Sequence, residues 1–332
     1  MKDIKELQRE IKELKNELSV TIVAHYYQKD EVFETADITG DSLQLAQKAS
    51  QADSEYVLFC GVGFMGQSVK IISPEKRVVM PKIACCAMAR MIDSEYFDQS
   101  VEYMVKKGID KEDILPITYI NSNAEVKAKV AQMGGMVCTS SNASKIIEKA
   151  LSSGKKILFV PDKCLGQNIA IKMGVKSCVI GEGECDPKEA DIICYNGFCS
   201  VHQLFEVEDV EFFRKKYPGI KIAVHPECKP EVCKLADFVG STSQLLNYVR
   251  SLPEDQKVAV GTEYNFVHRL RSKNTYVLSS TKPECPTMNE TTLQDVADVL
   301  YAIKKGDPIN EIFVDEETRK WAKIALERMF EI

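Results

Sequence analysis

Short runs of apolar residues recur along the chain, and each is followed by a polar turn and then by a segment with helical spacing of its apolar positions. Three such runs end in polar side chains, in the strings VAHYYQ, ITYINS and IAVHPEC. Strand-like runs that alternate with helical patterns are typical of βα units with a parallel sheet. The pattern therefore predicts an α/β fold in which helices flank parallel sheets.

The three runs belong to a longer repeat of four short units. After each strand-like run come a hydroxyl before a helical pattern (Ser42, Ser140 and Thr242), a second apolar run, and a segment with a cysteine. The interval from strand end to hydroxyl is 17, 21 and 17 residues, and the interval from the second run to the cysteine is 27, 40 and 26 residues. This regular period indicates three copies of one unit, with an insertion in the middle copy near residues 174–189.

Polar side chains follow the strand-like runs at the point where each run ends. They are His25 and Tyr27 in the first copy, Tyr119 and Asn121 in the second, and His225 and Glu227 in the third. The carboxyl ends of parallel strands face the crevice where ligands bind, so we expect these side chains to line a functional site. The hydroxyls of the second units are expected at helix starts, in helices over residues 42–49 and 140–150, where they suit anions.

Two helical patterns lie outside the repeats. Apolar residues at three- and four-residue spacing predict an N-terminal docking helix with Ile4, Leu7, Ile11, Leu14 and Leu18 on one face. From Glu290 to the end, the pattern predicts two helices around Asp307 and Pro308 that pack back on the first domain.

The composition is typical of a globular protein. The chain has 332 residues, of which 45% are hydrophobic and 28% charged, and its net charge is −6. The longest apolar stretch, residues 83–89, is far short of the roughly 18 residues that suggest a membrane span. No stripe of Lys and Arg stands out, so we expect neither a nucleic-acid nor a membrane partner. The N-terminal segment has no apolar signal region, which favours the cytoplasm.

Twelve cysteines are scattered along the chain without any C-x-x-C pair, which excludes zinc ribbons and the sequential ferredoxin pattern. Four lie beside or within apolar runs and are expected to be buried core thiols: Cys60, Cys138, Cys178 and Cys194. Four others have no counterpart in the other copies and are expected in loops: Cys164, Cys185, Cys228 and Cys233.

One cysteine occupies the same place in each copy, namely Cys86, Cys199 and Cys285. Three equivalent thiolates suit a soft metal centre. In a cubane cluster, three ligands leave one iron open, and an open metal can act as a Lewis acid. Cys85 would point to the opposite side of an extended chain from Cys86. His202, three residues after Cys199, is a candidate for a supporting position near the metal.

Taken together, these segments resemble the quinolinate synthase family. The family's blocks occur in the family's order over nearly the whole chain, as AHYYQ, GDSLQLA, CCAMA, YINSNAEVKA, CTSSNA, VPDKCLGQN, NGFCSVH, VHPEC, GSTSQL, GTEYNFVHRL and ECPTMNETTL. The resemblance implies an α/β fold of three αβα sandwich domains with parallel sheets, related by a pseudo-threefold axis. We place their limits at residues 1–113 with 286–332 packing back on them, at 114–215 and at 216–285.

The resemblance also implies a reaction, in which iminoaspartate (iminosuccinate) and dihydroxyacetone phosphate condense to quinolinate, phosphate and two waters in de novo NAD biosynthesis. Cys86, Cys199 and Cys285 would hold a [4Fe-4S] cluster with one open iron. Tyr27 and Glu227 would be the acid–base pair. The implied substrate contacts are His25, Ser42, Tyr119, Ile120, Asn121, Ser140, His225, Pro226, Glu227 and Thr242, with His25 and His225 also counted as catalytic. An L-aspartate oxidase or an aspartate dehydrogenase would supply the iminoaspartate.

Two other classes of protein share part of this pattern. Three-domain iron–sulfur enzymes of diphthamide synthesis or of hydroxymethylbutenyl-diphosphate reduction also use three cysteines, but they leave VAHYYQ and VHPEC without a role. Cleavage of S-adenosylmethionine would identify the diphthamide type. The non-enzymatic alternative is a structural zinc or electron-transfer protein, which one bound zinc without iron or sulfide would identify.

Overall fold

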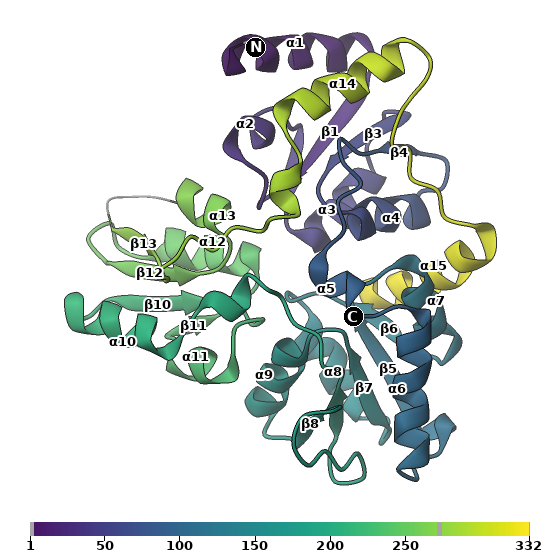
Figure 1. The fold of residues 1–332 in the computed structure, drawn as a ribbon, viewed down its shortest axis with the longest axis vertical. Helices are drawn as coiled ribbons and strands as arrows, with labels where there is room; N and C mark the ends of the chain where they lie inside the picture. Colours follow the sequence, from purple (N-terminus) through teal and green to yellow (C-terminus); the bar gives the residue numbers. More distant parts are fainter. Residues whose placement is uncertain (1–2, 271–273, 332) are drawn as a thin grey trace. The chain divides into compact units, whose positions relative to one another are not determined.

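The computed structural model describes residues 3–270 and 274–331 of the chain (Figure 1). They form two compact units, Met1–Cys86 with Glu284–Arg319 (unit 1) and Ala87–Pro283 with Lys320–Ile332 (unit 2). Residues 1, 2 and 332, which the predicted domain limits include, lie outside the described residues. The predicted limits themselves stay a prediction, as does the pseudo-threefold relation.

Unit 1 is built on a four-stranded parallel sheet with strand order β2-β1-β3-β4. Its strands are β1 (Val20–His25), β2 (Ile38–Gly40), β3 (Tyr56–Cys60) and β4 (Arg77–Val79). Its helices are α1 (Ile4–Glu17), α2 (Asp30–Phe33), α3 (Ser42–Ser50), α4 (Gly63–Ile72), the 3₁₀ turn η3 (Met288–Glu290) and α14 (Leu293–Lys304). Each polar turn after a strand leads into a helix, as the pattern predicts.

The N-terminal helix α1 lies alongside α14 (Figure 1). Leu7, Ile11 and Leu14 are buried in one core cluster with Leu300 of α14 and Ile22 of β1. This confirms the docking helix and the packing of the first tail helix. The apolar face is shorter than expected, because α1 ends at Glu17 and its first residue is exposed.

Unit 2 contains a five-stranded parallel sheet with strand order β6-β5-β7-β9-β8. Its strands are β5 (Ile114–Tyr119), β6 (Met136–Cys138), β7 (Lys156–Val160), β8 (Ser177–Val179) and β9 (Ile192–Cys194). Its helices are α5 (Ala87–Arg90), α6 (Ser94–Lys106), the 3₁₀ turn η1 (Lys111–Asp113), α7 (Ala124–Gln132), α8 (Ala143–Leu151) and α9 (Lys163–Met173). The edge strand β8 falls inside the insertion expected at residues 174–189, so the insertion adds a strand.

Unit 2 also contains a four-stranded parallel sheet with strand order β11-β10-β12-β13. Its strands are β10 (Lys221–Val224), β11 (Phe238–Val239), β12 (Val258–Gly261) and β13 (Thr275–Val277). Its helices are the 3₁₀ turn η2 (His202–Leu204), α10 (Val207–Lys216), α11 (Pro230–Leu235), α12 (Thr242–Ser251) and α13 (Tyr264–Arg269). Three parallel sheets with helices between their strands confirm the predicted α/β fold of three αβα domains.

The last helix, α15 (Glu316–Phe330), places its final residues in unit 2. The guanidinium of Arg328 donates to the carbonyl of Gly135 at 2.7 Å and to that of Ala131 at 3.4 Å, at the turn between α7 and β6. The end of the tail therefore packs on the second copy of the repeat, where the pattern had suggested the first. Among the described residues, no helix is long and apolar enough to cross a membrane.

Candidate active site

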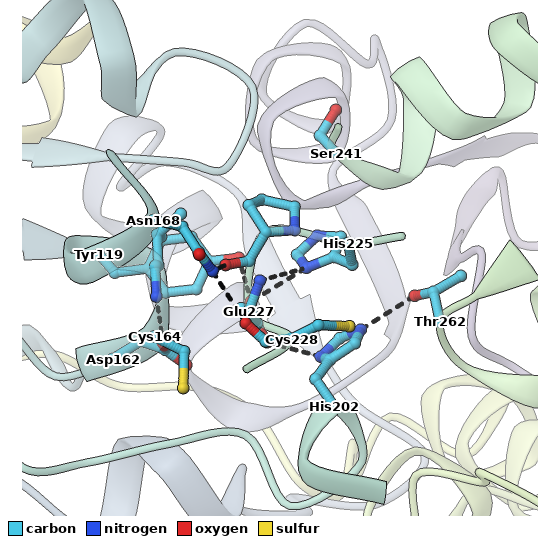
Figure 2. Close-up of polar contacts among 12 residues, drawn as sticks. Tyr119, Asp162, Cys164, Asn168, His202, His225, Glu227, Cys228, Ser241 and Thr262 are labelled. Carbon is cyan, nitrogen blue, oxygen red and sulfur yellow. Dashed lines mark hydrogen bonds and ion pairs between the residues drawn. The ribbon is translucent and has the colours of Figure 1, made fainter. Parts of the chain in front are cut away.

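The carboxyl ends of β5 and β10 meet inside unit 2, and both carry predicted site residues (Figure 2). Tyr119 is the last residue of β5, and Glu227 lies three residues past the end of β10. The hydroxyl of Tyr119 donates a hydrogen bond to Oε1 of Glu227 at 2.6 Å, and both side chains are buried. The structure therefore brings together strand-end residues that are 108 positions apart in the sequence.

The other carboxylate oxygen of Glu227 contacts His202, a residue that sequence reasoning placed only near the metal. Nδ1 of His202 lies 2.9 Å from Oε2 of Glu227, and Nε2 lies 3.0 Å from Oγ1 of Thr262. An ionised carboxylate can only accept, so Nδ1 of His202 carries a proton. The imidazole of His225 stacks on that of His202 with ring centroids 4.5 Å apart (Figure 2).

These contacts set the charge of Glu227. Burial would raise the pKa of its carboxyl, but the nearby imidazoles of His225 and His202 and the hydrogen bonds from His202 and Tyr119 outweigh burial and hold the pKa below its usual range. Glu227 is therefore a carboxylate at neutral pH. It is better suited to accept a proton or a hydrogen bond than to donate one.

A second buried carboxyl, Asp162, lies between β7 and α9 (Figure 2). Its Oδ1 caps α9 by accepting from the backbone N–H of Leu165 at 2.7 Å, while Oδ2 has no hydrogen-bond partner among the described residues. Burial and the charge of Glu227 raise the pKa of Asp162 well above its usual value. The sequence did not predict Asp162 or Thr262 as site residues, because only the fold brings Asp162 near Glu227 and Thr262 into contact with His202.

The turn after β5 and the turn after β10 present the remaining predicted contacts of unit 2. Oδ1 of Asn121 is buried without a hydrogen-bond partner in the described structure. The carbonyl of Pro226 accepts from the side-chain amide of Asn168 at 2.8 Å, which fixes the turn that carries His225 and Glu227. Ile120 follows Tyr119 directly, and its N–H donates to the carbonyl of Cys138 on β6 at 2.8 Å.

The predicted helix-start hydroxyls differ from the expectation in one respect. The cap of α3 is Asp41 and the cap of α12 is Ser241, so Ser42 and Thr242 are the first residues of their helices. The helix expected from residue 140 begins only at Ala143, because Thr139 and Asn142 hydrogen-bond to each other and close a turn around Ser140. None of the three predicted hydroxyls is therefore the cap.

A cavity of about 340 Å³ lies beside Ser140 in unit 2. Its lining includes Pro226 and Gln244, together with residues of α8 and α9. Oγ of Ser141 donates to Oγ of Ser241 at 2.9 Å, which ties the turn before α8 to the cap of α12. The two sheets of unit 2 thus share one polar, hollowed edge.

In unit 1, the turn after β1 is built much like the turn after β10 in unit 2. His25 is buried, and its Nδ1 accepts from the backbone N–H of Tyr27 at 3.1 Å. The rings of His25 and Tyr27 meet edge to face with centroids 4.6 Å apart. Ser42 begins α3 behind the Asp41 cap. The assignment of these three residues to substrate stays a prediction.

The three repeat-equivalent cysteines, Cys86, Cys199 and Cys285, are each half-buried, whereas Cys85 is exposed. Potential ligand atoms of Cys199, His202 and Glu227 all lie within 4.8 Å of one another, the one such group of three among the described residues. Partly accessible thiols, once deprotonated, are the soft donors that an iron–sulfur cluster requires, so the donor type and exposure of each of the three cysteines suit such a group.

The other cysteines divide into three kinds. Cys60, Cys138 and Cys194 are buried, as expected, and burial raises the pKa of each thiol. Cys178 was expected to be a core thiol, but the structure joins it to Cys185 in a disulfide at the insertion. Of the four loop predictions, two were wrong: Cys164 lies in α9 and Cys233 in α11, where helical spacing places their thiols against neighbouring elements.

A family model and several similar sequences indicate one family. The family described as "Quinolinate synthetase A protein" matches residues 9–331. A quinolinate synthase of Helicobacter pylori (strain HPAG1) is 55% identical over 98% of this chain and 98% of its own length. Quinolinate synthases of Streptomyces coelicolor (39% identical, 93% of this chain and 84% of its own length) and Bacillus anthracis (38%, 98% and 93%) are also similar.

Proposed function

The chain belongs to the quinolinate synthase family, and we propose that it condenses iminoaspartate (iminosuccinate) with dihydroxyacetone phosphate. The products would be quinolinate, phosphate and two waters. The ring nitrogen and both carboxylates of quinolinate would come from iminoaspartate, because dihydroxyacetone phosphate contains neither. We place this reaction in de novo NAD biosynthesis in the cytoplasm. An L-aspartate oxidase or an aspartate dehydrogenase would supply the iminoaspartate.

One observation carries the proposal. The carboxylate of Glu227, held by Tyr119 and His202, lies within 4.8 Å of the thiol of Cys199, the predicted cluster ligand of unit 2. Loss of water requires a proton acceptor for the C–H next to the leaving hydroxyl, and a proton donor or a Lewis acid at that hydroxyl. The two predicted functions, acid–base chemistry and metal binding, therefore fall on neighbouring side chains.

Cys86, Cys199 and Cys285 would hold a [4Fe-4S] cluster. When bound, a cluster with three protein ligands supplies an open iron, which as a Lewis acid makes a substrate hydroxyl a better leaving group. The support for this cofactor is the donor set itself, with one half-buried thiol in each copy of the repeat.

The proposed proton transfers divide between Glu227 and Tyr27. Glu227 is ionised at neutral pH, so its carboxylate would accept a proton from the substrate carbon that loses one. The hydroxyl of Tyr27 would donate a proton. His202 and Thr262 would hold the Glu227 carboxylate in its orientation, and His25 and His225 would flank the reacting atoms.

The remaining predicted contacts would bind the anionic groups of the substrates. Hydroxyl and amide side chains donate to carboxylates and phosphate, and the first turn of a helix adds backbone N–H groups. The proposed donors are Ser42, Asn121, Ser140 and Thr242. Tyr119, Ile120 and Pro226 would contact the substrate from the same turns without donating, because the one O–H of Tyr119 and the N–H of Ile120 already have partners and proline has no N–H. The side-chain N–H₂ of Asn121 would donate to such an anion, whereas its buried and unpartnered amide oxygen can only accept, as from the imine N–H of iminoaspartate.

An anaerobic assay tests the proposal. Protein purified without oxygen should contain about four iron and four sulfide per chain and should form quinolinate from iminoaspartate and dihydroxyacetone phosphate. S-adenosylmethionine should remain uncleaved in the same preparation. Iron-loaded protein that forms no quinolinate would overturn the proposed reaction, and one zinc without iron or sulfide would overturn the proposed cofactor.

A further inference from the structure

Helix α7 buries a lysine beneath the turn that follows β5. The side chain of Lys127 is fully buried, and its ammonium donates to the carbonyl of Ile120 at 2.9 Å and to the carbonyl of Ser122. Burying an ammonium is costly unless its hydrogen bonds are satisfied. Burial lowers the pKa of Lys127 to about 7, although the charge of Glu125 opposes this shift.

The two carbonyls that bind Lys127 flank Asn121 on both sides. Both are turned toward the ammonium, so the backbone at Asn121 is fixed at each end. The amide oxygen of Asn121 is not used in the turn, and it is buried without a hydrogen-bond partner in the described structure. This oxygen can accept an N–H or O–H of a ligand, and the N–H₂ of the same amide is the group that can donate to a carboxylate.

Further hydrogen bonds make the turn a single rigid piece. Oγ1 of Thr118 donates to Oγ of Ser122 at 2.9 Å, and Oγ of Ser122 lies 3.1 Å from the carbonyl of Tyr119. Tyr119 in turn donates to Glu227. A shift of this turn would therefore move Tyr119 and Asn121 together and would disturb one of the contacts on Glu227.

We propose that Lys127 is a positioning residue for substrate binding, whose ammonium holds the carbonyls of Ile120 and Ser122 so that Tyr119 and Asn121 face the dicarboxylate. This inference rests on the proposed function, which assigns Tyr119 and Asn121 to the substrate. Lys127 itself does not touch substrate. The competing interpretation is that Lys127 only stabilises the fold, as buried lysines that satisfy backbone carbonyls often do.

The test compares Lys127→Met with Lys129→Met. Methionine keeps the length of the side chain but removes the donors, and Lys129 lies on the same helix with its ammonium paired to Asp98 at 2.5 Å on the surface. Quinolinate is the probe, because it is a stable dicarboxylate whose binding can be measured by calorimetry without turnover. We expect Lys127→Met to weaken its affinity about tenfold or more, which corresponds to about 1.4 kcal/mol, and Lys129→Met to leave it unchanged.

A double substitution separates positioning from simple stabilisation. If Lys127 acts through Asn121, then Asn121→Ala and Lys127→Met together should weaken quinolinate binding no more than the stronger single substitution, since coupled residues are not additive. The KM for iminoaspartate should rise in Lys127→Met more than kcat falls.

Two results would overturn the inference. One is wild-type affinity in a folded Lys127→Met protein, whatever its melting temperature. The other is loss of folding in both Lys127→Met and the milder Lys127→Gln, which would assign Lys127 to the fold alone. Failure of the proposed function is a separate outcome, because it would show as a wild-type protein that forms no quinolinate.

Discussion

The first and third copies of the repeat share one local construction, and the second copy does not. His25 is the last residue of β1 and His225 directly follows β10, 200 positions later, and Nδ1 of each accepts from the backbone N–H two residues later, at 3.1 Å and 3.4 Å. Asp37 and Asp237 each accept from the backbone N–H of an isoleucine, Ile22 and Ile222, at 2.9 Å and 2.8 Å. The same hydrogen bonds are thus built twice from equivalent residues.

The second copy reaches a similar turn by other means. Its strand β5 ends in Tyr119 rather than in a histidine, and the hydroxyl of Tyr119 donates to Glu227. The ammonium of Lys127 holds this turn by donating to the carbonyl of Ile120. This copy also has the extra strand β8 and a disulfide beside it.

The comparison also concerns the position of the turn to which we assign the proposed chemistry. Two residues after the strand-end residue stand Tyr27 in the first copy, Asn121 in the second and Glu227 in the third. These are a proposed proton donor, a neutral amide and a proton acceptor. Under the proposed function, the residue at this single position would therefore divide the work among the three copies.

The largest expected effect tests whether each copy of the repeat supplies one cysteine ligand that the proposed cluster requires. Replacing Cys86, Cys199 or Cys285 by Ser should each remove the cluster and all detectable quinolinate formation, because three thiolates are needed to hold a cubane. Iron and sulfide analysis of anaerobic protein measures this. Cys85→Ser is the matched control and should keep both cluster and activity. A clusterless Cys85 variant beside a loaded Cys86 variant would reverse the ligand assignment.

The next effect tests the proposed roles of Tyr27, Asn121 and Glu227, which stand at the equivalent position of the three turns. Tyr27→Phe removes one hydroxyl and Glu227→Gln one charge, and each should lower kcat by about 10² to 10⁴ while leaving iron content unchanged. Asn121→Ala should act mainly on KM, since an amide neither gives nor takes the proton. Near wild-type turnover in either acid–base variant would show that its residue does not transfer a proton.

The sequence predicted the features that repeat along the chain. It did not predict contacts between side chains that only the fold brings together. The period of the repeat exposed the strand ends, the helix starts and the equivalent cysteines, since these are local and recur. Thr262, Asp162 and Lys127 had no counterpart in the other copies, so no pattern marked them, and His202 was placed near the metal but not beside Glu227. The partners of His202, Thr262 and Asp162 are up to 65 positions away along the chain, as between Asp162 and Glu227, and only the fold brings them together.

Local competition explains the smaller errors. The helix predicted from residue 140 starts at Ala143, because Asn142 binds Thr139 and keeps the intervening serines in a turn. Cys178 lies in the inserted strand β8, where apolar neighbours suggested a core thiol, but the edge position leaves it able to reach Cys185. A single sequence without contacts cannot distinguish these cases.

A moderate effect tests the hydroxyls at the helix starts of the first and third copies. Because Asp41 and Ser241 are the caps, Ser42→Ala and Thr242→Ala should leave the melting temperature nearly unchanged and raise KM about tenfold, as expected for a lost hydrogen bond to an anion. Ser241→Ala is the opposite control and should cost about 1 kcal/mol of stability. A lower melting temperature with unchanged KM in both hydroxyl variants would make them structural.

The smallest effect concerns stability alone and is confined to the second copy. Burial lowers the folded-state pKa of Lys127 to about 7, whereas an unfolded lysine has a pKa of about 10.4. Between these values the unfolded chain binds more protons at this residue, so its contribution to the free energy of unfolding rises with pH from about 7 to about 10.4. Above that range the contribution is complete, and it is lost as pH falls through 7.

Urea unfolding at pH 7 and pH 9 measures this contribution. The free energy of unfolding should rise less between the two pH values in Lys127→Met than in the wild type or in Lys129→Met. An equal rise in all three proteins would mean that Lys127 stays charged in the folded state, and that its two carbonyl partners are enough to offset burial.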